Sequence, residues 1–159
     1  MKSFAAETLI LASAGIVWDI ITDAGNYPVW DSGITDIKGE IRNRARIRVR
    51  LRIGGKRAYR LRVRQVPGRR MTWTGGLPLG LLRVERAFTV TDYTGITHLT
   101  VRDTARGALQ WLVRRSAPAA DPAVSGFTDE VKFRAELLSF HIHGGVFPTT
   151  SGGLRGLRR

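Results

Sequence analysis

The sequence predicts a single α+β domain in which a curved antiparallel sheet is covered by a long C-terminal helix. Three observations predict it: an amphipathic helix near the start, several later segments that alternate apolar and polar residues, and an apolar stripe at helical spacing near the end. A chain of 159 residues can bury about 70% of its unfolded surface. We expect the domain to span residues 1–140, followed by a flexible Gly/Arg-rich tail over 141–159.

The first helix is predicted by its cap and by its apolar spacing. Ser13 is a suitable N-cap, and Gly25-Asn26 and Pro28 end the helix. A strand over residues 4–11 precedes it. Between cap and end, the apolar residues that share one face are Ile16, Val17, Ile20 and Ile21.

The clearest alternation lies in residues 44–53, which we expect to pair with residues 59–64 as a hairpin. If both strands bury their apolar residues on the same side, the connecting loop must contain an odd number of residues. Gly54-Gly55-Lys56 supplies a loop of three, which would place Leu51 opposite Tyr59 and Val49 opposite Leu61. A weaker strand is expected over residues 34–41.

Further strands are predicted over residues 69–74, 81–91 and 97–105. Residues 75–80 between the first two are expected to form a flexible apolar loop, and Thr94-Gly95 a two-residue turn. A short helix over 107–115 and a final helix that opens at Asp121-Pro122 complete the chain. The apolar stripe of the final helix is Val124, Phe127, Val131, Ala135 and Leu138. One helix must cover the apolar face of the sheet, which would otherwise be exposed to water.

The order of these elements and several short motifs resemble the START-like polyketide-cyclase and lipid-transport (SRPBCC) superfamily. The motifs are the small-residue cap and Val-Trp of residues 13–18, the Tyr27-Pro28-Val29-Trp30 segment, the Trp73 to Pro78 stretch and the helix over 127–136. The resemblance covers roughly residues 4 to 138. It implies a helix-grip fold, in which a curved sheet grips a long helix around an apolar cavity.

The two-residue turn at Thr94-Gly95 would place Arg86 directly opposite Asp103, each on the apolar side of its strand. One interpretation is that Arg86 orients a carbonyl, carboxylate or phenolate of a ligand while Asp103 holds the guanidinium. The alternative is an ion pair that fixes the hairpin register and touches no ligand.

The resemblance implies that a hydrophobic or polycyclic small molecule binds between the sheet and the last helix, for carriage, sensing or sequestration. The runner-up is an enzyme of the polyketide cyclase/dehydratase type that uses Arg86, Asp103 and Tyr59 as polar cavity groups; no assembled acid-base or nucleophilic machinery is recognisable. The residues expected to line the cavity are Trp30, Val49, Leu51, Tyr59, Leu61, Trp73, Leu77, Leu82, Val84, Arg86, Phe88, Leu99, Val101, Asp103, Phe127 and Val131.

A formal net charge of +13 is typical of proteins with a polyanionic partner. In the predicted hairpin register Arg50 faces Arg60, Arg48 faces Arg62 and Arg46 faces Arg64, and like charges directly opposed across strands are unfavourable. A nucleic-acid backbone, an acidic carrier protein or lipid headgroups would offset that repulsion, which makes an adaptor role a third hypothesis. A solvated sheet face with splayed side chains is the alternative.

The chain contains no cysteine, which excludes disulfides, thiol catalysis and cysteine-zinc sites and favours a reducing, cytoplasmic location. No leader-like or membrane-spanning run is apparent. His141 and His143 have no further ligand nearby, so we expect no metal, and no phosphate-loop or dinucleotide motif indicates a cofactor. Oligomeric state and ligand identity stay open.

Overall fold

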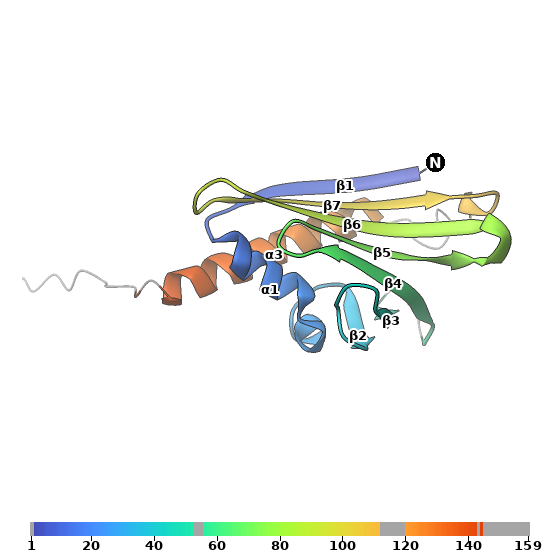
Figure 1. Cartoon of the computed structure of the whole chain (residues 1–159), viewed down its shortest axis with the longest axis horizontal. Coiled ribbons are helices and arrows are strands. Elements are labelled where there is room, and N and C mark those ends of the chain that lie inside the picture. Colours follow the sequence, from blue (N-terminus) through green and yellow to red (C-terminus); the bar gives the residue numbers. More distant parts are fainter. Residues whose placement is uncertain (1, 53–55, 112–119, 143, 145–159) are drawn as a thin grey trace, which may run out of the picture.

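The computed structural model describes residues 2–52, 56–111, 120–142 and 144, and it consists of a seven-stranded antiparallel sheet with a long helix against one face (Figure 1). The strand order is β1-β7-β6-β5-β4-β3-β2. The predicted helix-grip α+β fold is confirmed. In chain order the elements are β1 (Lys2–Ile10), α1 (Ala14–Thr22), the 3-10 helix η1 (Ala24–Val29), β2 (Ile34–Lys38), β3 (Arg46–Leu51), β4 (Ala58–Val66), β5 (Arg70–Leu77), the 3-10 turn η2 (Pro78–Gly80), β6 (Leu82–Asp92), β7 (Thr97–Arg106) and α3 (Ala120–Ile142).

The segment from α1 to η1 forms as the sequence predicts. The Ser13 hydroxyl accepts a hydrogen bond from the Ile16 backbone N–H at 3.4 Å and so caps α1. The Tyr27 hydroxyl donates to the Ile21 carbonyl at 2.7 Å, and both residues are fully buried. This bond holds η1 beneath the end of α1, which directs the aromatic residues of η1 into the core.

The β6–β7 hairpin has the predicted register. The Tyr93 N–H donates to the Ile96 carbonyl at 2.8 Å, and Thr94 and Gly95 have φ angles of 58° and 88°. Positive φ at both turn residues matches the twist of the paired strands. Counting back along the ladder, Arg86 lies directly opposite Asp103.

The predicted β3–β4 register is wrong by two residues: Val49 pairs with Tyr59, not with Leu61, and Leu61 pairs with Ile47. Parity requires only an odd connection, so a longer one keeps the same residues inside. The Arg52 N–H donates to the Gly33 carbonyl at 2.9 Å and its side chain pairs with Asp31, so the end of β3 is held toward β2 rather than β4. Of the expected loop residues, Gly54 and Gly55 lie outside the described residues, and Lys56 is in a turn.

Residues 75–77 were expected in a flexible loop but belong to β5, which corrects that prediction. A Cβ atom on Gly76 would lie 2.0 Å from the Leu82 carbonyl oxygen, and one on Gly75 would lie 2.6 Å from Leu61 Cδ2. The two glycines therefore permit close strand approach rather than mobility.

The final helix begins at Ala120, and its stripe of Val124, Phe127, Val131 and Ala135 is buried. Leu138, the last residue of the predicted stripe, is 46% exposed. The helix continues through His141 and Ile142, the first two residues of the expected tail; of the rest, only Gly144 is described.

Two side chains of α3 tie it to the chain around the end of β1: Glu136 accepts the Leu11 N–H at 3.0 Å, and Lys132 donates to the Leu9 carbonyl. Within the part of the chain that the structure describes, no helix is long and apolar enough to cross a membrane. Of the short helix predicted over 107–115, Gln110 and Trp111 are helical, residues 107–109 form a bend and a turn, and residues 112–115 lie outside the described residues.

Candidate functional site

Five aromatic residues, here called the aromatic cluster, fill the middle of the space between the sheet and α3. Neighbouring rings lie 5.1 to 6.1 Å apart between centroids, and each residue is at most 5% exposed. Such tilted contacts are favourable for aromatic rings. The cluster consists of Tyr27, Trp30, Trp73, Phe88 and Phe127. The centre of the expected cavity is thus packed with side chains.

The inner face of the sheet stays partly accessible beyond the cluster, toward the start of β6. Five residues there are half-buried although their side chains have the inward parity of their strands: Leu61, Leu82, Val84, Arg86 and Asp103. Three are aliphatic and two are charged, so this open part of the inner face combines an apolar floor with one ion pair.

Arg86 and Asp103 form a bidentate ion pair, here called the inner pair. The Arg86 Nε and Nη2 atoms donate to the two Asp103 carboxylate oxygens, both at 2.7 Å, and the side chains are 20% and 28% exposed. Burial works against the charge of Arg86, but the Asp103 carboxylate outweighs it and raises the pKa of Arg86. Arg86 therefore stays charged near neutral pH.

The guanidinium of Arg86 retains donors that Asp103 does not use. Its Nη1 atom has no partner among the described residues, and its Cζ atom lies 5.5 Å from the centroid of the Phe127 ring. Burial also raises the pKa of Tyr27, with a smaller opposing effect from Arg86. Tyr27 is thus a neutral phenol, and Arg86 is the cation at the edge of the aromatic cluster.

Two indole N–H groups of the cluster are buried without an acceptor. Neither Trp30 Nε1 nor Trp73 Nε1 has a hydrogen-bond partner among the described residues. A buried donor left unpaired costs about 1 to 3 kcal/mol. Such groups often mark places where a ligand or a water supplies the missing acceptor.

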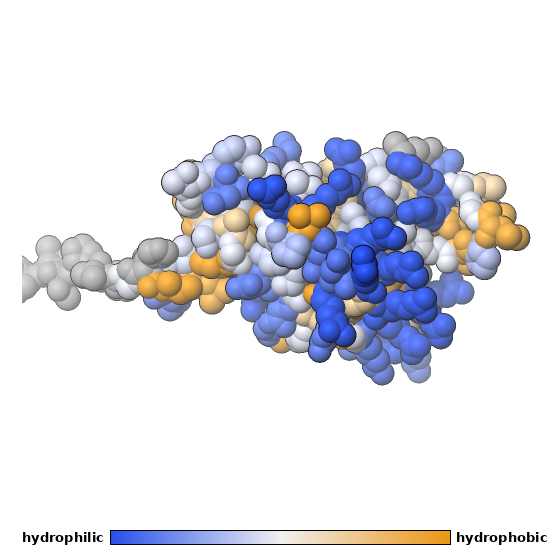
Figure 2. Space-filling model, in the orientation of Figure 1, coloured by the Kyte–Doolittle hydropathy of each residue, from blue (hydrophilic) through white to orange (hydrophobic). Residues whose placement is uncertain are grey.

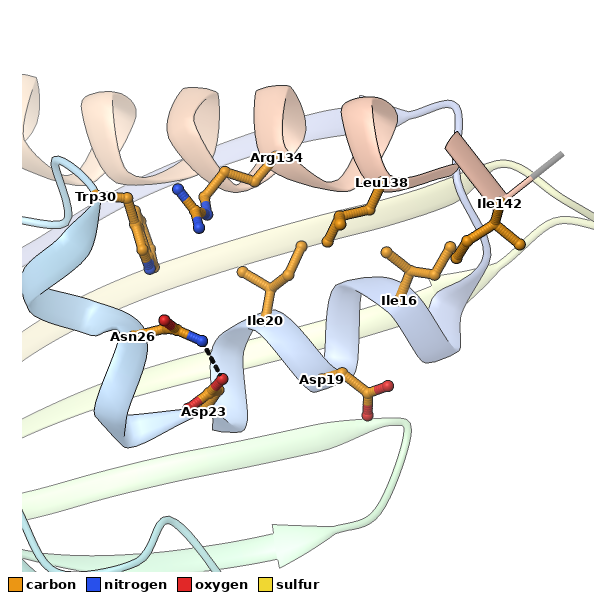
Figure 3. Close-up of a pocket in the computed structure, with 9 residues that line it drawn as sticks. All are labelled: Ile16, Asp19, Ile20, Asp23, Asn26, Trp30, Arg134, Leu138 and Ile142. Carbon is orange, nitrogen blue, oxygen red and sulfur yellow. Dashed lines mark hydrogen bonds between the residues drawn. The ribbon is translucent and has the colours of Figure 1, made fainter. Parts of the chain in front are cut away.

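A separate groove of about 230 Å³ lies between α1 and the C-terminal half of α3 (Figure 3). The Ile16 and Ile20 side chains of α1 point toward Leu138 and Ile142 of α3, while Arg134 extends toward Trp30. Asp23 and Asn26 are hydrogen-bonded to each other at the same end. Asp19 also lines the groove. Trp30 both lines the groove and packs on Phe127 at 5.2 Å, so it separates the groove from the interior.

The sequence-predicted cavity residues fall into three groups by burial. Tyr59 and Leu77 are the most exposed, at 38% and 46%. Across the sheet Arg86 lines up with Trp73 and Val63, so Tyr59 is four residues along β4 from the inner pair. Leu51 is half-buried, as are the five residues of the open part of the inner face. The buried members are Trp30, Val49, Trp73, Phe88, Leu99, Val101, Phe127 and Val131.

The groove was not predicted from the sequence, although a signal for it exists. Arg134, Leu138 and Ile142 follow one another at intervals of four residues and so share one face of α3. Ile16 and Ile20 have the same spacing on α1. The apolar spacing predicts that Leu138 belongs to the stripe that packs on the sheet, whereas Leu138 lies on a second face of α3 that is directed toward α1.

The outward residues of β3 and β4 form the outer arginine face, made of Arg46, Arg48, Arg50, Arg60, Arg62 and Arg64, all exposed. Figure 2 shows hydrophilic side chains gathered over this part of the sheet. The register shift corrects the predicted pairs: Arg46 faces Arg62, Arg48 faces Arg60, and Arg50 faces Ala58. Two of the three like-charge oppositions remain, with new partners, and among the described residues none of the six arginines has a carboxylate partner within an ion-pair distance.

Several solved structures share this fold at low sequence identity. A hypothetical protein from Helicobacter pylori aligns with a TM-score of 0.69 and 13% identity, over 84% of this chain and 88% of that one. A START superfamily protein from Mycobacterium smegmatis aligns with a TM-score of 0.63 and 17% identity, over 86% and 98%. The di-domain ARO/CYC BexL of the BE-7585A biosynthetic pathway aligns with a TM-score of 0.63 and 14% identity, over 82% of this chain and 46% of BexL.

No curated protein matches the chain. The family described as "Polyketide cyclase / dehydrase and lipid transport", however, matches residues 1–137, which include every strand, α1 and most of α3. The match agrees with the folded architecture and with the solved relatives. The chain therefore belongs to the polyketide cyclase/dehydrase and lipid transport family.

Proposed function

We propose that the protein binds a hydrophobic or amphipathic small molecule on the open part of the inner face, with the inner pair holding its polar group. The observation that carries this proposal is the half-buried Arg86–Asp103 pair, whose free Nη1 donors lie beside aliphatic and aromatic side chains. A pocket with an apolar lining and a few fixed polar groups is the usual form of a small-molecule site.

The chemistry of the pair favours a ligand with an anionic or strongly polar oxygen. Asp103 binds one edge of the Arg86 guanidinium and so fixes the conformation of the Arg86 side chain. The remaining guanidinium donors are therefore held in one orientation before a ligand binds. A carboxylate, phenolate or carbonyl oxygen is a suitable acceptor. Trp73 lies directly across the strand pair from Arg86, and its buried indole N–H has no acceptor among the described residues.

The test uses anilinonaphthalene sulfonate, a small apolar dye with one anionic group. The double variant Arg86→Gln/Asp103→Asn replaces the ion pair by two uncharged amides, and we expect it to weaken dye binding by about tenfold, because the charged hydrogen bond is lost. Arg102→Gln is the matched control, since Arg102 is an exposed arginine on the outward side of β7. Equal affinity for the wild type and the double variant would contradict the proposal.

A second candidate is an enzyme of the cyclase/dehydratase type at the same place. The specific observation in its favour is that the free donors of Arg86 could polarise a carbonyl beside the Asp103 carboxylate. Material extracted from purified wild-type protein and from the double variant distinguishes the roles. A carrier leaves the mass of the bound compound unchanged, whereas an enzyme that eliminates water yields a compound lighter by one water only in the wild type.

A further inference from the structure

The turn between β5 and β6 carries the most exposed apolar side chain among the described residues. Leu79 is 97% exposed at the tip of η2, and Leu77 and Leu81 beside it are 46% and 42% exposed. Figure 2 shows a hydrophobic patch at the end of the molecule where β5 turns into β6 in Figure 1. Three leucines within five residues at one tip form a contiguous apolar protrusion, here called the leucine tip.

The backbone of the leucine tip is unfavourable for leucine. Leu79 has φ 59° and ψ 20°, the left-handed conformation that glycine and asparagine adopt far more readily than branched residues. Neither core packing nor backbone preference accounts for a leucine here, because the side chain is in water. A residue that is unfavourable both for its conformation and for its exposure indicates a contact made outside the folded chain.

The leucine tip is adjacent to cationic side chains on the outward face. Arg83 follows Leu81 by two residues and lies on β6, directly opposite Arg106 on β7. Together with Glu85 and Thr104 they line a shallow hollow of about 190 Å³. Neither arginine has an ion-pair partner in the part of the chain that the structure describes, and the outer arginine face continues the positive surface onto β4 and β3.

We propose that the leucine tip, together with Arg83 and Arg106, docks the protein reversibly onto an anionic lipid bilayer. Exposed leucines enter the interfacial region, and arginines beside them bind lipid phosphates. A nucleic-acid duplex would use the arginines but leave the leucines unexplained, since its phosphates offer no apolar partner. This inference is independent of the ligand proposed for the inner face.

Vesicle co-sedimentation provides the first test. We expect the wild type to bind phosphatidylcholine vesicles that contain about one third phosphatidylglycerol, to bind pure phosphatidylcholine vesicles far less, and to be released by salt. Leu79→Asn suits the left-handed backbone and keeps the fold, and we expect it to weaken binding by about tenfold. Tyr93→Asn is its control, because Tyr93 is 59% exposed at the opposite end of β6.

A pair of double variants separates local from general electrostatics. Arg83→Gln/Arg106→Gln and Arg69→Gln/Arg70→Gln lower the net charge equally, but the second pair lies at the far end of β5. We expect the first to reduce vesicle binding several-fold more than the second. Equal losses in both, with Leu79→Asn unchanged, would overturn the proposal in favour of nonspecific attraction.

Because the chain has no cysteine, a single thiol can report insertion directly. Leu79→Cys labelled with an environment-sensitive fluorophore should shift to the blue on anionic vesicles, and Tyr93→Cys labelled in the same way should not. Absence of a shift at position 79, or tight binding of duplex DNA together with no vesicle binding, would overturn the proposal.

Discussion

Arginine side chains on the two faces of the sheet differ in burial and in ion pairing. On the inner face Arg86 has a carboxylate partner at 2.7 Å and is packed beside Phe127. On the outer face six arginines of β3 and β4 are exposed without such a partner among the described residues. Burial makes a partner obligatory inside, while water makes it dispensable outside. Substitutions should therefore have large effects on the inner face and small effects on the outer face.

The largest loss of stability is expected at Phe127, which contacts Tyr27, Trp30 and Phe88 and lies beneath Arg86. Phe127→Ala should lower the free energy of unfolding by about 3 to 5 kcal/mol, because it leaves a cavity at the centre of the cluster. Urea denaturation measures it. A loss below about 1 kcal/mol would contradict this prediction, because it would mean that the aromatic cluster rearranges to fill the space left by Phe127.

The inner pair is expected to show the next largest effect. Asp103→Asn leaves the charge of Arg86 half-buried without compensation and should cost about 2 to 3 kcal/mol, somewhat less than a fully buried pair. The double variant Arg86→Leu/Asp103→Leu should be within about 1 kcal/mol of the wild type, since neither charge remains. If the double variant is as unstable as Asp103→Asn, the pair acts by packing and not by charge.

The lowered pKa of Glu136 leads us to expect that part of the stability of the protein depends on pH in the acid range. The hydrogen bond from the Leu11 N–H, opposed by burial and aided by Lys132, lowers the pKa of Glu136 in the folded protein. A lowered folded pKa gives stability that is present above the unfolded pKa and lost as pH falls through the folded pKa. Thermal unfolding between about pH 6 and pH 3 should show a decline that is smaller in Glu136→Gln, by at most about 1 kcal/mol. Identical pH profiles would show that the docking of α3 at the end of β1 does not use this charge.

The smallest effects, with opposite signs, are expected on the outer face. Arg48 lies between Lys38 and Arg60 on the neighbouring strands, whereas Arg50 lies between Asp36 and Ala58. At low salt Arg48→Gln should stabilise the protein by a few tenths of a kcal/mol and Arg50→Gln should destabilise it by a similar amount. High salt should remove both differences. A destabilising Arg48→Gln would indicate that the arginine stems, not their charges, support this face.

Local patterns in the sequence predicted the inner pair but could not predict the packed cluster. A two-residue turn fixes its register by geometry, so the position of Arg86 opposite Asp103 followed from Thr94-Gly95. The β3–β4 turn left the length of the connection open, and contacts of Arg52 with β2 decided it. Whether Tyr27, Trp30 and Trp73 line a cavity or fill it depends on how η1 packs beneath the sheet, and no local pattern specifies that.

The most direct test of ligand binding at the inner face is a titration of the isotope-labelled protein with anilinonaphthalene sulfonate. The side-chain N–H signals in NMR spectra report the binding. The account predicts shifts at the Trp73 indole and at the Arg86 Nε–H, with no shift at Trp111, which is 51% exposed. A shift at Trp30 alone would instead place the dye in the groove between α1 and α3. Shifts confined to the arginines of the outer face, with Trp73 and Arg86 unmoved, would contradict the account.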